Sequence, residues 1–209
     1  MTLTIGILII AGYLLGSIPS AVWIGKWFYH TDVREHGSHN AGATNTLRVL
    51  GRRAALPVFV IDAAKGYAAV MLSHFAELEG DALFFLKIGL TAAAILGHIF
   101  PLFAGFKGGK GVATMAGCML AIAPVPMLLG LATFIVVLAA THYVSLGSMT
   151  GGVLFPVYII LIDGFHSPYK IGFGVFVAVV LLITHRKNIQ RLRAGTENKT
   201  YLFLKRPKS

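Results

Sequence analysis

The chain has 209 residues, of which 56% are hydrophobic and only 12% charged, and its mean hydropathy is +0.76. Because a soluble domain is nearer one-quarter charged, this composition favours a single membrane-embedded domain over residues 1–209. The net charge of +10 lies in short loops and a tail between apolar segments. That distribution is typical of topology signals and argues against nucleic-acid binding.

The predicted elements are apolar helices. Residues 1–25 contain no charged side chain, and the run is too long for the core of a cleaved signal peptide, so a retained first span is expected. A later run is too long for one span, and Pro124 and Pro126 are expected to divide it into two short helices. In chain order the predicted spans are about Leu3–Phe28, Ala54–Phe75, Ala82–Leu102, two within Val112–Tyr143, Met149–Ile162 and Lys170–Thr184.

These segments predict an all-α polytopic membrane protein with about seven transmembrane helices, some of them short. Five long spans are the alternative. Of the 18 Lys and Arg residues, all but Lys65, Lys87 and Lys170 fall on or beside one face. Since cytoplasmic loops carry an excess of these residues, we expect the N-terminus outside, the C-terminus in the cytoplasm and the polar segments on the cytoplasmic face.

The first polar segment is GSHNAGATNTLR, residues 37–48. Its small residues can present several backbone N–H groups to an anion, and a planar guanidinium suits a phosphate. The alternative is a hydrophilic connector with a helix N-cap. The candidate donors are Ser38, Asn40, Thr44, Asn45 and Arg48.

The second polar segment is FKGGKG, residues 106–111. Gly108 and Gly109 let the backbone approach a ligand closely, and the ammonium groups of Lys107 and Lys110 can hold a phosphate. A helix beginning after it would point its positive N-terminal end at the same place. The pattern is not a Walker A loop, because Gly111 follows Lys110. A flexible, topology-setting basic loop is the alternative.

Two more polar segments follow. In YVSLGS, residues 143–148, Ser145 or Ser148 could donate to a ligand, although a serine that satisfies a helix end is the favoured interpretation. In the basic tail, His185 and Asn188 would share one helix face, and a histidine can act as a base near neutral pH. Glu197 could orient a basic partner. The alternative for the tail is an amphipathic helix on anionic lipid.

Other ionisable residues receive structural interpretations. Asp62 and Lys65 lie three positions apart in the second span, and we expect a mutually neutralised pair. The sole cysteine, Cys118, excludes an intramolecular disulfide and a zinc-binding cysteine cluster. Four histidines are expected to be structural, because their spacing does not match a metal site: His74, His98, His142 and His166.

Taken together, the four segments resemble the membrane glycerol-3-phosphate acyltransferases that use acyl phosphate, the PlsY family. They are GSHNAGATNTLR, GHIFPLFAGFKGGKGVAT, YVSLGS and HRKNIQRLRAGTE, and their order and spacing agree over nearly the whole chain. His39 and Ala41 depart from the family pattern at positions that are not expected to be catalytic.

The resemblance implies a reaction. A long-chain acyl group would pass from acyl phosphate to the 1-hydroxyl of glycerol 3-phosphate, giving lysophosphatidic acid and inorganic phosphate. This is the first step of bacterial phospholipid synthesis, so the implied location is the bacterial inner membrane. No cofactor or metal is implied, and neither acyl carrier protein nor coenzyme A is the direct donor. The expected partners are the two substrates and membrane lipids, and the expected state is a monomer.

Site residues follow from motif position. The implied base is His185, or a phosphate oxygen of the substrate itself. The implied catalytic residues are Ser38, Arg48, Lys107, His185 and Asn188. The implied substrate-binding residues are Asn40, Thr44, Asn45, Gly108, Gly109, Lys110 and Ser145.

Two other functions compete with the enzyme. A transporter of a phosphorylated small molecule would place its polar breaks near the midplane and often contains paired repeats, which are not evident in the sequence. A non-catalytic lipid-binding protein would use the basic face only to recruit anionic headgroups.

Overall fold

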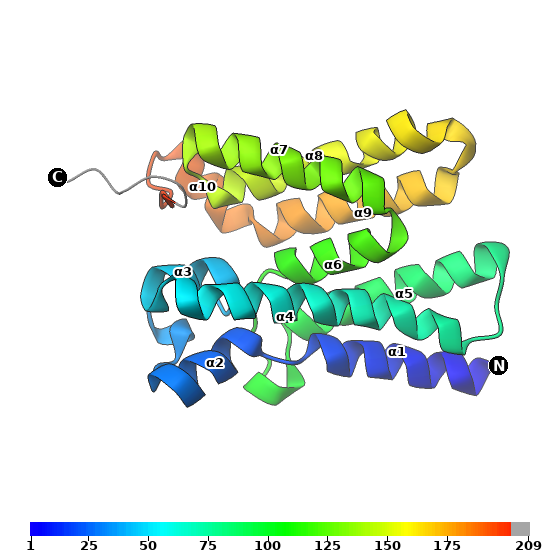
Figure 1. Cartoon of the computed structure of the whole chain (residues 1–209), viewed down its shortest axis with the longest axis horizontal. Coiled ribbons are helices and arrows are strands. Elements are labelled where there is room, and N and C mark those ends of the chain that lie inside the picture. The colour runs from blue at the N-terminus through cyan, green and yellow to red at the C-terminus, as the bar shows by residue number, and fades with distance from the viewer. Residues whose placement is uncertain (202–209) are drawn as a thin grey trace. The chain divides into compact units, whose positions relative to one another are not determined.

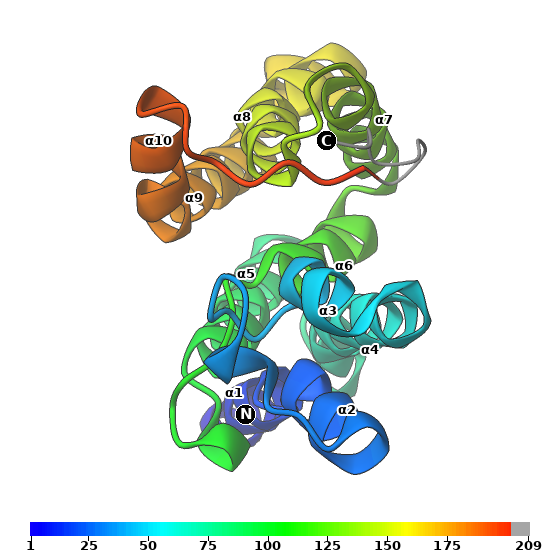
Figure 2. The same cartoon turned by 90° about the vertical axis from the view of Figure 1, so that its left-hand side faces the viewer.

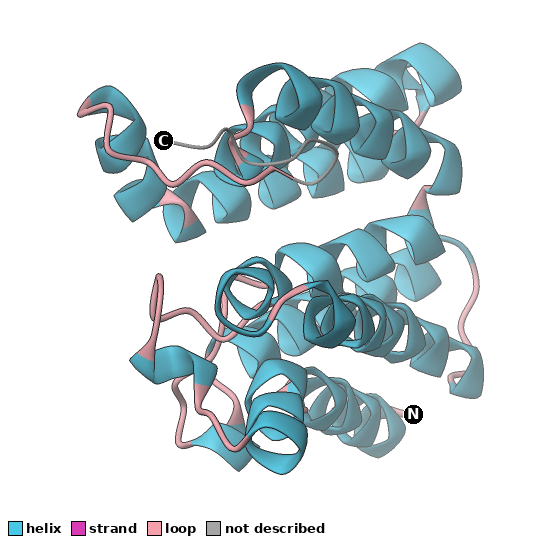
Figure 3. Cartoon of the chain, turned by 60° about the vertical axis from the view of Figure 1, so that its left-hand side comes forward, coloured by secondary structure: helices cyan, strands magenta, loops and turns pink. Residues whose placement is uncertain are grey.

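The computed structural model describes residues 1–201, and these residues form helices and loops without a β-strand among them (Figure 3). The chain divides into two compact units, the first covering Met1–Ile122 and the second beginning at Ala123. In the first unit the α-helices are α1 (Thr2–Gly16), α2 (Ser20–Tyr29), α3 (Ala43–Leu50), α4 (Arg52–Met71), α5 (Gly80–Ile99) and α6 (Val112–Ile122). In the described part of the second unit they are α7 (Pro124–Thr141), α8 (Val144–Asp163), α9 (Pro168–Thr184) and α10 (Arg186–Arg193) (Figure 1). Short 3-10 turns are η1 (Val33–Glu35), η2 (Leu72–Phe75), η3 (Leu102–Ala104) and η4 (Gly164–His166).

Every predicted span is present as an apolar helix. By length and composition, five segments among the described residues can cross a membrane, and α9 with α10, bent by 62°, would make a sixth. The 11-residue α6 is shorter. The predicted division after residue 122 is confirmed, because Pro124 and Pro126 occupy the first turn of α7, where a missing N–H costs no hydrogen bond.

Two predicted boundaries are wrong. The first span was expected to be one helix, but α1 ends at Gly16 and α2 begins at Ser20, because Pro19 interrupts the ladder of backbone hydrogen bonds. The sixth span was expected to begin at Met149, but α8 begins at Val144. The Ser148 hydroxyl donates to the Val144 carbonyl at 2.9 Å, so this polar side chain is satisfied within the helix.

In the first unit, α4 packs against all five other α-helices. Glycines allow the closest approach: a Cβ at Gly66 of α4 would overlap the Thr114 carbonyl of α6, and one at Gly117 of α6 would overlap the Ala63 carbonyl of α4. Small residues at helix contacts are typical of membrane proteins, where backbones gain packing contacts by close approach. The α4–α6 pair thereby forms a rigid frame behind the polar loops.

In the second unit, α8 packs against both α7 and α9. The buried rings of Phe155 and Phe173 meet edge to face at 6.0 Å between centroids. The segment after α10 returns past the beginning of α8 towards α7 (Figure 2). There the Thr200 N–H donates to the His142 carbonyl at 2.7 Å, and the Tyr201 ring lies 4.5 Å from the His142 ring. The second unit is thus closed by its own tail.

Candidate active site

The loop that carries Ser38 is organised by Asn45 of α3. The Asn45 side chain, only 1% exposed, accepts the Ser38 N–H at 2.8 Å and donates to the carbonyls of Val33 and His36 at 2.7 and 3.0 Å. A side chain at Gly37, whose φ is +62°, would collide with Asn45. Because its amide serves the backbone, Asn45 shapes the loop, and its predicted contact with substrate stays a prediction.

The remaining candidates of this motif are partly exposed. Ser38 and Asn40 lie in the loop, and Thr44 and Arg48 lie one turn apart on α3, with Arg48 in its last turn. Residues at i and i+4 face the same side of a helix, so a hydroxyl and a guanidinium share one face of α3. That pairing suits an anion, which can accept hydrogen bonds from both groups.

The glycine–lysine loop, residues 106–111, is fixed to the end of α5. The N–H groups of Gly108 and Gly109 donate to the carbonyls of Ile99 and His98, each at 3.1 Å. A side chain at Gly108 would overlap the His98 carbonyl, and one at Gly109 would overlap the His98 ring. These two N–H groups, predicted to bind phosphate, therefore hold the loop in place. Lys107 is exposed, and Lys110 is partly exposed.

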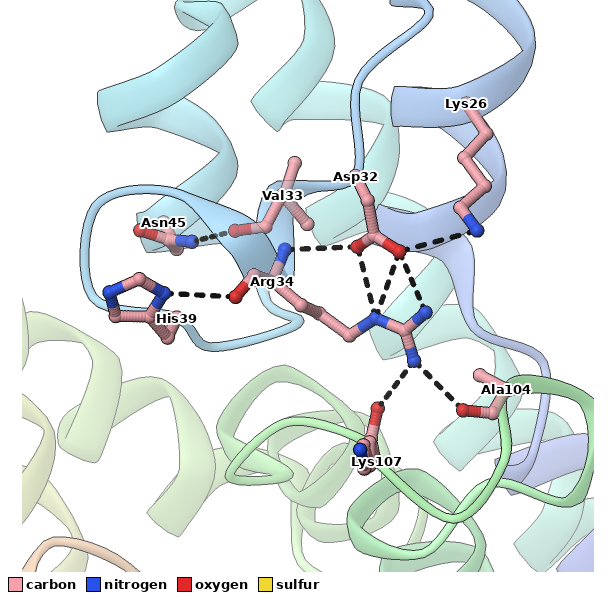
Figure 4. Close-up of polar contacts among 8 residues, drawn as sticks. All are labelled: Lys26, Asp32, Val33, Arg34, His39, Asn45, Ala104 and Lys107. Atoms are coloured by element: carbon pink, nitrogen blue, oxygen red, sulfur yellow. Dashed lines mark hydrogen bonds and ion pairs between the residues drawn. The ribbon is translucent and has the colours of Figure 1, made fainter.

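The Ser38 loop and the glycine–lysine loop lie side by side at one end of the first unit (Figures 2 and 3). Arg34 joins them, because its guanidinium donates to the carbonyls of Ala104 and Lys107 at 2.8 and 3.3 Å (Figure 4). A Cβ at Gly109 would lie 2.7 Å from the Ala41 carbonyl, so the two backbones also approach each other there. The structure thus brings together the two loops that carry Ser38 and Lys107, residues that lie 69 positions apart in the sequence.

An aromatic cluster flanks the glycine–lysine loop. The rings of Trp23 and Trp27 on α2 stack at 5.1 Å, and Trp23 lies 6.3 Å from the ring of Phe103 in η3. Trp27 is 64% exposed. Exposed tryptophans of membrane proteins favour the level of the lipid headgroups, so this cluster marks the expected interface beside the loop.

Beneath these loops lies a buried ionic network. Asp62 and Lys65 form the predicted pair at 2.8 Å, with side chains only 2% and 3% exposed. The Ser20 hydroxyl donates to Asp62 at 2.8 Å, and Lys65 donates to the Ile18 carbonyl at 2.7 Å. His98 lies 3.6 Å from Asp62, and its Nδ1 also contacts the Thr114 hydroxyl at 3.0 Å. His98, expected to be structural, thus links this network to the glycine–lysine loop.

In the second unit, the Glu197 carboxylate accepts hydrogen bonds from two predicted site residues, Ser145 and Asn188. Its Oε1 accepts from the Ser145 hydroxyl at 3.0 Å and from the Asn188 amide at 2.7 Å. Its Oε2 accepts from Arg191 Nε at 2.7 Å, which bears out the expected basic partner. Burial by itself would raise the pKa of Glu197, but the hydrogen bonds from Arg191, Asn188 and Ser145 outweigh burial and lower it, so the carboxylate stays ionised.

His185 stands at the bend between α9 and α10 and is 2% exposed. Its Nδ1 lies 2.9 Å from the Leu181 carbonyl, which can only accept, so the neutral ring carries its proton on Nδ1. Nε2 is then the nitrogen that can take up a proton. Asn188 follows one turn later, and its N–H donates to the His185 carbonyl at 2.8 Å, as the predicted spacing requires.

The sequence prediction did not single out Asp32 and Arg34, although an acid and a base two positions apart directly precede the first motif. The described residues contain no cluster of three or more His, Cys, Asp or Glu side chains that could hold a metal ion.

Comparisons with known proteins agree with one another. Residues 6–195 match the family model described as glycerol-3-phosphate acyltransferase. A glycerol-3-phosphate acyltransferase of Listeria monocytogenes is 46% identical over 200 residues, covering 95% of this chain and 98% of that protein. One of Salinibacter ruber is 41% identical over 212 residues, covering 94% and 93%.

Two crystal structures of PlsY, an integral membrane glycerol 3-phosphate acyltransferase, also match. Its glycerol 3-phosphate form is 32% identical with a TM-score of 0.84, covering 96% of this chain and 99% of that one. Its lysophosphatidic acid form is 31% identical with a TM-score of 0.81, covering 94% and 95%.

Proposed function

Because this chain belongs to the glycerol-3-phosphate acyltransferase family, we propose that it transfers a long-chain acyl group from acyl phosphate to the 1-hydroxyl of glycerol 3-phosphate. The structures of the related enzyme in glycerol 3-phosphate and lysophosphatidic acid forms support the acceptor and the product. The phosphate donor is supported by the four motifs quoted above. This transfer would be the first step of bacterial phospholipid synthesis.

The observation that carries the proposal is the juxtaposition of the Ser38 loop with the glycine–lysine loop in the first unit. Both substrates of the proposed reaction carry a phosphate, so cationic and hydroxyl groups must be presented on a fixed backbone. Lys107, Lys110 and Arg48 are the proposed cations, with Ser38 as a hydroxyl donor. The pinned backbone of the loop limits how far Lys107 can move from its binding position.

The proposed chemistry is a single acyl transfer. The glycerol oxygen attacks the carbonyl carbon, the bond from that carbon to the phosphate oxygen breaks, and its electron pair leaves with inorganic phosphate. The hydroxyl proton goes to His185 Nε2 or to a phosphate oxygen. Because a mixed anhydride has a good leaving group, positioning and charge stabilisation would supply most of the acceleration.

The second unit would supply the catalytic base, His185. The hydrogen bond from Nδ1 to the Leu181 carbonyl supports Nε2 of His185 as the proton acceptor. Glu197 fixes Ser145 and Asn188, the other proposed residues of this unit. This arrangement favours the histidine over the substrate phosphate as the base, and a pH–rate profile of the His185 variant, described below, tests that choice.

The proposed setting is the bacterial inner membrane, with the N-terminus outside and both the C-terminus and the chemistry on the cytoplasmic side. The Lys and Arg distribution supports this orientation. We further propose that the two compact units act as a single enzyme domain and that the protein works as a monomer. A soluble glycerol phosphate would then arrive from water and an acyl chain from lipid.

The test measures phosphate released from palmitoyl phosphate by the purified protein in detergent micelles. Release is expected only when glycerol 3-phosphate is present, with lysophosphatidic acid formed in equal amount. Palmitoyl-coenzyme A offered instead of palmitoyl phosphate should give no product. Absence of turnover with folded protein would refute the proposal, and uptake of glycerol 3-phosphate into vesicles without an acyl donor would favour the transporter.

Variants test the residue assignment in the same assay. Lys107→Ala and Arg48→Ala are expected to abolish turnover without unfolding the protein. Arg53→Ala is the matched control, because Arg53 is an exposed basic residue at the beginning of α4. Wild-type rates in both active-site variants would refute the assignment, even if the reaction itself is found.

A further inference from the structure

We propose that Arg34 is a positioning residue for this reaction: anchored by Asp32, its guanidinium fixes the backbone that carries Lys107 against the Ser38 loop. The inference rests on the proposed function, because it takes Lys107 as a phosphate-binding lysine. Neither Arg34 nor Asp32 belongs to the predicted site, and neither needs to touch a substrate in this role.

The guanidinium works in two directions at once (Figure 4). Nε and Nη2 donate to the two carboxylate oxygens of Asp32, at 3.0 and 2.7 Å. Nη1 faces the other way and donates to the carbonyls of Ala104 and Lys107. A planar group with five N–H donors can make these bonds simultaneously, whereas the single ammonium of a lysine cannot span them.

Asp32 is a firm anchor for this clamp. It caps η1 by accepting the Arg34 N–H at 3.0 Å, and Lys26 adds an exposed ion pair at 3.3 Å. The hydrogen bond from Arg34 holds the pKa of Asp32 well below its ordinary value, and the same bond raises the pKa of Arg34. Both partners therefore stay charged throughout the physiological pH range, so a change of pH within that range does not break the ion pair.

The main chain around Arg34 is equally fixed to the first motif. The Arg34 carbonyl accepts from His39 Nδ1 at 3.0 Å, directly beside Ser38, and the Val33 carbonyl accepts from Asn45. Arg34 therefore belongs structurally to the Ser38 loop while its guanidinium holds the glycine–lysine loop. A displacement of either loop changes the distance between the Ser38 hydroxyl and the Lys107 ammonium.

Lys107 depends on such support. Its side chain is exposed, so the protein restrains it chiefly through its backbone. The peptide group that follows Lys107 is held twice, because its N–H, from Gly108, donates to the Ile99 carbonyl of α5 and its carbonyl accepts from Arg34. Before Lys107, Arg34 also holds the Ala104 carbonyl. Loss of the clamp would loosen the peptide groups on both sides of Lys107, although the Phe106 N–H stays bonded to the Pro101 carbonyl. A misplacement of about 1 Å in a binding group can cost on the order of 100-fold in rate.

A direct contact of Arg34 with a substrate phosphate is the competing role. All three of its nitrogens already donate to protein acceptors, which favours positioning. The two roles respond oppositely to the loss of Asp32. Asp32→Asn removes the negative charge and the acceptor of Nη2, so the anchor is weakened and a positioning residue works less well. A residue that binds phosphate directly keeps its charge and continues to bind.

The experiment compares Arg34→Lys, Asp32→Asn and Asp32→Glu in the palmitoyl phosphate assay. Arg34→Lys and Asp32→Asn are expected to raise the KM of at least one phosphate substrate by on the order of 10- to 100-fold, with kcat less affected. Asp32→Glu keeps the ion pair but moves the guanidinium, so an intermediate rise is expected in a folded protein. Lys26→Ala is the matched control, because Lys26 pairs with the same carboxylate through a side chain that is 53% exposed, and its kinetics should be those of the wild type.

Wild-type KM values in Arg34→Lys would overturn the inference, and so would a rise in Arg34→Lys that Asp32→Asn does not share. If Arg34→Lys or Asp32→Asn melts below the assay temperature, the KM of Asp32→Glu decides whether the inference holds, and a wild-type value would overturn it. The activity of Lys107→Ala shows which of the two proposals has failed. If Lys107→Ala is active, Lys107 does not have the proposed phosphate-binding role on which this inference rests. If Lys107→Ala is inactive while the Arg34 and Asp32 variants are normal, only the positioning role of Arg34 is refuted.

Discussion

Removal of Asp62 should destabilise the first unit far more than removal of Lys65. In Asp62→Asn, Lys65 loses its carboxylate counter-charge and keeps only neutral acceptors, the Ile18 carbonyl and the new amide oxygen, at a site where its side chain is 3% exposed. Breaking one side of a buried ion pair costs about 3–5 kcal/mol. In Lys65→Met, Asp62 keeps the hydrogen bond from the Ser20 hydroxyl and still has the His98 ring at 3.6 Å, so the loss should be about 1–3 kcal/mol.

The structure supplies a matched control for this comparison. Lys170 and Asp163 form a pair of similar length, 2.9 Å, but their side chains are 36% and 25% exposed. A solvated pair contributes about 0–1 kcal/mol. For a chain of this length, roughly 2–4 °C corresponds to each kcal/mol. Asp62→Asn should therefore melt about 6–20 °C below the wild type, and Asp163→Asn at most about 4 °C below it.

The assay can use the protein's own thiol. Cys118 is the single cysteine and is fully buried in α6, where its Sγ contacts the Gly66 carbonyl of α4. A maleimide dye that fluoresces on reaction therefore reports the opening of the first unit during heating. Equal melting temperatures for Asp62→Asn and Asp163→Asn would refute the argument from burial, and so would a double variant of Asp62 and Lys65 whose loss equals the sum of the single losses.

Three further predictions concern packing, pH and catalysis. Gly117→Ala should lower the melting temperature, because its methyl group would overlap the Ala63 carbonyl. Gly172→Ala, which has open space within α9, should melt at or slightly above the wild type, because alanine favours the helix. Equal behaviour of the two variants would contradict the close α4–α6 packing. Because the folded pKa of Glu197 lies below its ordinary 4.5, the carboxylate stabilises the fold above that pH and loses this effect as the pH falls below it. Thermal melts should therefore show a difference between the wild type and Glu197→Gln that is constant from about pH 6 to 8 and shrinks below 4.5; a difference that grows on acidification would contradict the hydrogen-bond assignment. His185→Gln should reduce kcat on the order of 100- to 10,000-fold and remove the acidic limb of the pH–rate profile; an unchanged limb would assign the base to a substrate phosphate.

Hydropathy predicted the helices of this protein well, and the breaks less well. Composition and run length located every apolar segment, and the membrane family is confirmed by relatives over most of the chain. The Pro124 break was predictable because proline removes a donor within a long run. The extension of α8 back to Val144 was not, because a serine in a short polar stretch can either end a helix or bond within it, and only the fold decides.

The site was predictable as a set of motifs but not as a set of contacts. The Asp62–Lys65 pair and the basic partner of Glu197 were expected from spacing and charge, and both are present. The contact of Asn45 with a substrate stays a prediction, but the hydrogen bonds by which its amide holds the Ser38 loop were not foreseen. Sequence names the donors and acceptors, whereas which of them satisfy one another depends on loops that are distant in the chain, as Arg34 and Lys107 show.

The stacked pair on α2 gives the molecule an optical property. Trp23 and Trp27 are its only two tryptophans, so all indole emission comes from this stacked pair. The pair lies beside Phe103, which precedes Lys107 by four residues. A phosphate bound at the glycine–lysine loop would change the electric field at these rings, and we expect the colour or intensity of that emission to change with it. The unlabelled enzyme therefore carries a fluorophore that is expected to report substrate arrival at this loop in real time.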